Sequence, residues 1–96
     1  MKKHYHILVL FVCTLSFTTF AQNVGIGTNT PDASAKLHVV DANRGLLIPN
    51  VSIGNVAAAA PVTAPATGLL VYNTNAAVTG GNGTGFYYWS GTQWLN

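Results

Sequence analysis

Three residue types that can build a hydrolytic site lie close together in this chain. Ser34, His38 and Asp41 would supply the nucleophile, the base and the carboxylate of a catalytic triad within eight residues. Triad members are normally brought together from distant parts of a fold, so this clustering favours coincidence over a hydrolase. His38 alternates with apolar neighbours on a predicted strand, which indicates a side chain that faces solvent.

Metal and cofactor sites have weaker support. His38, Asp32 and Asp41 could bind a metal, but only weakly. The Gly25-x-Gly27 pair is followed by Thr30 where a dinucleotide fingerprint requires glycine. The chain also contains no glutamate. We therefore predict no cofactor, no bound metal and no enzymatic activity.

The first 21 residues have the pattern of a signal peptide. Lys2 and Lys3 precede an apolar run over residues 7–20. Ala21 would be the last residue before the cut. The run is short for a membrane span, and we expect no span after cleavage. The leader predicts an exported protein at the outer surface or in the medium, with the periplasm as an open alternative.

Residues 22–96 are then expected to form one small domain of unusual composition. Cys13 lies in the leader, so disulfides and cysteine-ligated clusters are not expected. The remaining charges cancel, and they belong to Asp32, Lys36, Asp41 and Arg44. Without a basic patch, nucleic acid is not an expected partner. A small core without a disulfide or a bound metal favours a chain that completes its core by associating with copies of itself.

The pattern of elements predicts a mainly β fold of short strands with one short N-terminal helix. Thr30 and Pro31 are typical of a helix start, and the helix would end near Lys36. The predicted strands are residues 24–28, 37–40, 45–48 and 68–72, with a hairpin formed by 86–89 and 92–95. The similar segments GLLIPN (45–50) and GLLVYN (68–73) predict two strands in equivalent sheet positions.

Aromatic residues gather in the predicted hairpin. A two-residue turn at Ser90-Gly91 would place Tyr87 opposite Trp94, on the same face as Trp89. The other face would carry Phe86, Tyr88 and Leu95. Tyr87, Trp89 and Trp94 are our candidates for contact with a ligand or another subunit, since aromatic anchors are common at interfaces. Packing of one aromatic face against the core is the open alternative.

Four motifs resemble those of a family of secreted and cell-surface proteins of Gram-negative bacteria. They are NVGIGTNTPDASAKLHV (23–39), GLLIPNV (45–51), PATGLLVYNT (65–74) and GFYYWSGTQW (85–94). The first is also similar to modules of phage tail fibres and trimeric adhesin-like proteins. The resemblance implies a β-rich, non-enzymatic structural or adhesin-like module, functioning as a homotrimer. A carbohydrate- or receptor-binding module that uses the aromatic hairpin is the alternative.

Overall fold

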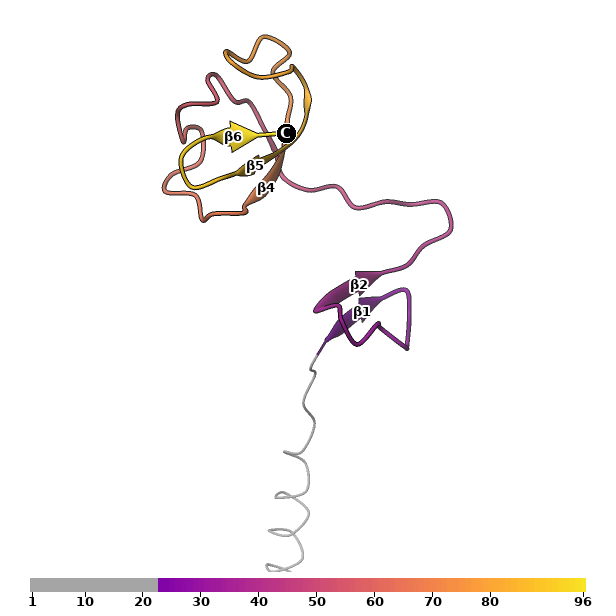
Figure 1. Ribbon diagram of the computed structural model, residues 1–96. Coiled ribbons are helices and arrows are strands. Elements are labelled where there is room, and N and C mark those ends of the chain that lie inside the picture. Colours follow the sequence, from indigo (N-terminus) through magenta and orange to yellow (C-terminus); the bar gives the residue numbers. More distant parts are fainter. Residues whose placement is uncertain (1–22) are drawn as a thin grey trace, which may run out of the picture. The chain divides into compact units, whose positions relative to one another are not determined.

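The computed structural model describes residues 23–96 and confirms a mainly β fold. The chain divides into two compact units between Gly45 and Leu46, and each unit holds one sheet (Figure 1). The predicted signal peptide lies outside the described residues. Within residues 23–96, no helix has the length and apolar character needed to cross a membrane.

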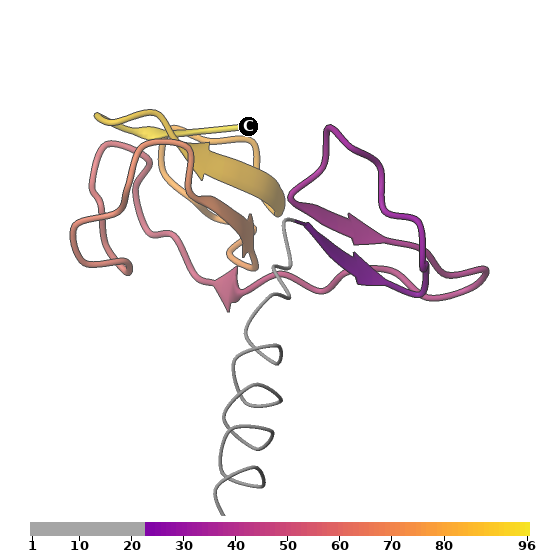
Figure 2. The same cartoon turned by 90° about the horizontal axis from the view of Figure 1, so that it is seen from below.

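The first unit is built on two short parallel strands. Strands β1 (Val24–Ile26) and β2 (Leu37–Val39) run side by side in both views (Figures 1 and 2). Gly27 follows β1 with a φ of 77°, and a Cβ there would overlap the backbone carbonyl of Val40. Glycine at this position therefore allows the backbone after β2 to approach closely.

The predicted helix near Pro31 is wrong, since residues 31–36 form a turn. The Asp32 carboxylate accepts hydrogen bonds from the backbone N–H of Ser34 (2.8 Å) and from its hydroxyl (2.5 Å). The N–H of Ala35 donates to the Asp32 carbonyl (3.0 Å), which closes a single turn. Six residues give too few hydrogen bonds to offset helix nucleation, and the chain continues directly into β2.

The second unit is a mixed four-stranded sheet in the order β3-β4-β5-β6. Its strands are β3 (Asn50–Val51), β4 (Leu70–Asn73), β5 (Gly85–Trp89) and β6 (Trp94–Leu95). β3 is parallel to β4, whereas β4–β5 and β5–β6 are antiparallel. The segments carrying the repeated GLL motif thus end in neighbouring parallel strands of one sheet.

The strand predicted at residues 45–48 is displaced toward the C-terminus. The paired residues begin only after Pro49, whose carbonyl accepts a hydrogen bond from the N–H of Tyr72 (3.0 Å). Proline has no N–H to donate to a ladder, so it suits the position just before a strand. Leu46 and Leu47 remain 66% and 85% exposed instead of entering the sheet.

One core lies within residues 46–96. Its buried apolar residues are Ile53, Val56, Val71, Val78, Tyr87, Trp89 and Trp94. Fully buried among them is Asn73, whose Oδ1 accepts from the N–H groups of Ile53 (2.9 Å) and Asn75 (3.0 Å). Its Nδ2 donates to the carbonyls of Asn75 and Gly83, both at 2.9 Å. The Asn73 amide thus ties the segment after β3 and both ends of the β4–β5 connection to the end of β4.

The C-terminal hairpin is confirmed, but its predicted turn is too short. Trp94 pairs with Trp89 rather than Tyr87, and the loop runs from Ser90 to Gln93. Ser90 braces this loop, because its Oγ donates to the Gln93 carbonyl (2.9 Å) and accepts from the Gln93 N–H (3.1 Å). The loop requires one positive φ, and it occurs at Gly91 (106°). Ser90 therefore does not have to adopt that conformation.

Candidate functional site

The residues of the hypothetical triad are each engaged in local turns. Ser34 Oγ donates to Asp32, while the Nδ1 of His38 accepts the backbone N–H of Asp32 (3.0 Å). Asp41 accepts from the guanidinium of Arg44, at 2.8 Å from Nη2 and 3.2 Å from Nε. These contacts organise two turns of the chain and do not aim a nucleophile, a base and a carboxylate at one another.

The two carboxylates are held in the charged form by their turns. Hydrogen bonds from Ser34 lower the pKa of Asp32, and the guanidinium of Arg44 lowers the pKa of Asp41. Both groups are exposed, so water screens these interactions strongly. Among residues 23–96, no three histidine, cysteine or acidic side chains are grouped so that they could hold a metal ion.

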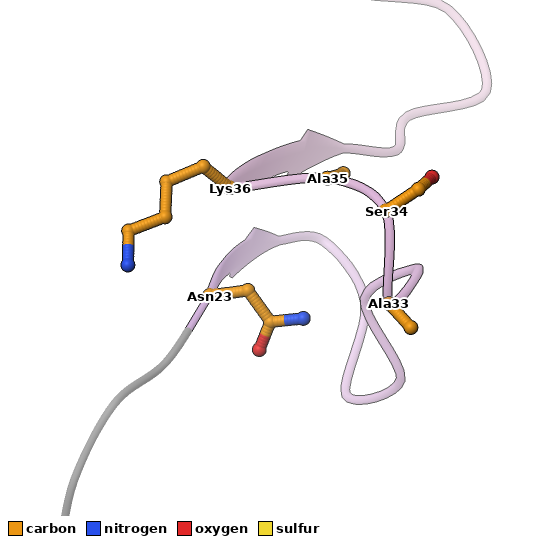
Figure 3. A pocket seen from close by; sticks show the side chains of 5 residues that line it. All are labelled: Asn23, Ala33, Ser34, Ala35 and Lys36. Carbon is orange, nitrogen blue, oxygen red and sulfur yellow. The ribbon is translucent and has the colours of Figure 1, made fainter.

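A hollow of about 380 Å³ lies in the first unit, lined by Asn23, Ala33, Ser34, Ala35 and Lys36. Figure 3 shows the Lys36 and Ser34 side chains extending away from each other. Asn23 Nδ2 donates to the carbonyl of Asp32 (3.2 Å), which ties β1 to the turn. The hollow therefore lacks the converging polar groups that define a ligand site.

The three candidate contact residues of the hairpin point into the core. Tyr87, Trp89 and Trp94 share one face as predicted, and they are 1%, 8% and 1% exposed. The Trp89 and Trp94 rings meet edge to face with centroids 5.2 Å apart. Tyr87 Oη donates to the Gly83 carbonyl (2.8 Å) and accepts the Asn82 N–H (2.9 Å). Their role as ligand or subunit contacts stays a prediction.

The opposite side of β4 and β5 exposes a second set of large side chains, which we call the outer aromatic face. It consists of Leu70, Tyr72, Phe86 and Tyr88, paired across the strands as Leu70 with Tyr88 and Tyr72 with Phe86. The Tyr72 and Phe86 rings meet edge to face at 5.3 Å. Phe86 is 59% exposed and Tyr88 is 44% exposed. This sheet is therefore apolar on both sides.

A cavity of about 170 Å³ adjoins the outer aromatic face. Its lining includes Tyr72, Phe86, the Leu46–Ile48 segment and the amide-bearing Asn50. Asn50 pairs with Tyr72 in the parallel ladder, so both side chains lie on the same side of the sheet. Sequence reasoning missed Asn50 because residues 45–48 were expected to form the strand. The alternation that places Phe86 and Tyr88 on one face of the hairpin was the available signal for the outer aromatic face.

A third surface lies on the first unit, and we call it the N-terminal apolar face. The register pairs Val24 with Leu37 and Ile26 with Val39, which places all four side chains on one side. They are 49%, 53%, 55% and 40% exposed, respectively. His38 lies on the opposite side and is half-buried, so the prediction that it faces solvent is wrong. The turn at Asp32 shields it.

Comparison with known proteins gives one family. The model of a phage tail-like trimerisation region matches residues 25–96, three quarters of the chain. Neither the comparison with curated proteins nor that with solved structures gave a match. The family match includes residues of both units. It covers the outer aromatic face and all of the N-terminal apolar face except Val24.

Proposed function

The chain belongs to the family of phage tail-like trimerisation regions, and from this premise we propose that it is an exported structural module that works as a homotrimer. The family points to self-association and to a non-enzymatic role. Two apolar surfaces in a chain with few charges support the same reading, because contiguous exposed apolar patches mark association sites. We propose an adhesin-like role at the cell surface.

The proposed assembly is tested on the full chain expressed in a Gram-negative host. We expect the protein recovered outside the inner membrane to have the intact mass of residues 22–96, as signal cleavage before Gln22 requires. Light scattering after size exclusion should then give three times that mass at micromolar concentration. A folded monomer would contradict the trimer, and an uncut chain retained in the cytoplasm would contradict export.

A second candidate function is carbohydrate binding, which the outer aromatic face favours. Phe86 and Tyr88 present exposed rings, and Asn50 adds an amide to the cavity beside Phe86. Aromatic rings stacked on sugars, with an amide for hydrogen bonds, are the chemistry such a site requires. Wild-type protein should then be retained on immobilised glycans, and retention should fall at least tenfold for Phe86→Ala with Tyr88→Ala. Absence of retention by the wild type would remove this candidate.

A further inference from the structure

We infer that the N-terminal apolar face, formed by Val24, Ile26, Leu37 and Val39, is the surface through which copies of this chain contact one another. The occupant of the face is the same face of the other copies. This inference rests on the proposed homotrimer and adds to it the location of the interface.

The first step is that only one side of the β1–β2 sheet is covered by its own unit. A Cβ on Gly25 would lie 2.7 Å from the Thr28 carbonyl and 3.4 Å from the Pro31 side chain. On that same side, the backbone N–H of Asp32 donates a hydrogen bond to Nδ1 of His38. The crossover from β1 to β2 therefore packs on the side of Gly25 and His38. Parallel sheets are normally covered on both faces, so the apolar side requires a partner.

The second step concerns the stability of the unit. None of the described residues 23–45 is buried, whereas residues 46–96 contain a core of their own. Two paired strands with no apolar core are at best marginally stable in water. The first unit thus needs contacts from outside itself to hold its fold. The second unit has no comparable requirement, which is why we place the subunit contact on the N-terminal apolar face and not on the outer aromatic face.

The third step is the chemistry of the face. Its four side chains are aliphatic and carry no charge, so identical copies can approach without electrostatic repulsion. A hollow of about 340 Å³ beside Ile26 and Val39 extends to the ion-paired Asp41 and Arg44. An apolar centre with a polar rim is the usual composition of a subunit interface. The match to a trimerisation family begins at Gly25 and includes all of β2 and all of β1 except Val24.

Site-directed cross-linking tests the inference, because Cys13 is the only cysteine of the chain. Ile26→Cys and the matched control Phe86→Cys are introduced into the full chain carrying Cys13→Ser. The two positions are similarly exposed, at 55% and 59%. After oxidation with copper-phenanthroline, Ile26→Cys should give disulfide-linked dimers on a non-reducing gel. At most two thirds of the chains should cross-link, because one thiol of each trimer is left without a partner. Phe86→Cys should stay uncross-linked.

A companion variant, Ile26→Asn, should lower the light-scattering mass from trimer to monomer. Both tryptophans lie in the core of residues 46–96, so their fluorescence reports whether that unit stays folded. Phe86→Asn should remain trimeric.

If the wild type is a trimer that cross-links through Phe86→Cys but not through Ile26→Cys, the inference is overturned and the interface lies on the outer aromatic face. If the wild type is a trimer and neither cysteine variant cross-links, the inference is overturned. The N-terminal apolar face would then pack against another part of the same chain. A monomeric wild type would instead contradict the proposed function itself.

Discussion

Replacing Asn73 with aspartate is expected to unfold residues 46–96 at neutral pH. Asn73 is fully buried, and its Nδ2 donates to the carbonyls of Asn75 and Gly83. A carboxylate cannot donate, so it would face both carbonyl oxygens without water to screen the repulsion. A buried polar group left unpaired costs about 1–3 kcal/mol, and an uncompensated buried charge costs about 3–5 kcal/mol. Such a loss is comparable with the whole stability of a domain this small.

The pH dependence of Asn73→Asp separates this electrostatic cause from a packing defect. Burial raises the pKa of a carboxyl group above its value in the unfolded chain, so the penalty applies at high pH. Stability should therefore recover as the pH falls toward about 4, where the acid becomes protonated and can donate one hydrogen bond. Urea unfolding followed by tryptophan fluorescence at several pH values measures this.

Asn55→Asp is the matched control for that experiment. Asn55 is exposed, and its Oδ1 accepts the N–H of Ala57 at 2.9 Å, a role that a carboxylate oxygen fills equally well. The urea midpoint of Asn55→Asp should differ little from that of the wild type at pH 7. If Asn73→Asp unfolded at the same urea concentration as Asn55→Asp, the Asn73 amide would not be the junction that the structure indicates.

The C-terminal hairpin shows which features of the fold the sequence could predict. Alternation in β5 correctly separated Tyr87 and Trp89 from Phe86 and Tyr88. The pairing of Trp94 with Trp89 was missed, because Ser90 folds its side chain onto Gln93 and lengthens the loop. That error shifts the register by two residues, which leaves every side chain on its predicted face. Faces were therefore more predictable than pairings.

Burial in the first unit was less predictable for a physical reason. Alternation placed Leu37 and Val39 on one side of a strand and His38 on the other. We predicted from this pattern that the His38 side chain faces solvent. The structure differs, because the crossover turn covers part of His38 while the aliphatic side stays open. In the assembly that we propose, the hydrophobic pattern of the first unit specifies a face that a single chain leaves exposed. The helix expected at residues 31–36 failed for the separate reason that it was too short.

Replacing Trp94 with alanine is the second change with a large expected effect. Trp94 is 1% exposed, stacks edge to face on Trp89, and its backbone N–H donates to the Val56 carbonyl (2.8 Å). Removing a buried tryptophan side chain costs about 3–5 kcal/mol, because the cavity is only partly refilled. Most molecules of Trp94→Ala should be unfolded at 37 °C. Circular dichroism during urea or thermal unfolding measures this without depending on the tryptophan signal.

Trp94→Phe and Tyr88→Ala make this prediction specific. Trp94 Nε1 is buried without a hydrogen-bond partner among the described residues, so phenylalanine removes an unpaired donor while keeping an aromatic ring in place. We expect it to lose much less stability than Trp94→Ala. Tyr88→Ala, on the 44% exposed side, should stay within about 1 kcal/mol of the wild type.

The same variants distinguish a core role for Trp94 from the ligand or subunit contact predicted from the sequence. A contact residue can be truncated without unfolding the protein, so its alanine variant would keep the wild-type midpoint and lose only binding or assembly. A core residue loses stability first, and any loss of binding or assembly follows from unfolding. The burial of Trp94 leads us to expect the second pattern. A fully stable Trp94→Ala that no longer assembles would assign the residue to the subunit interface instead.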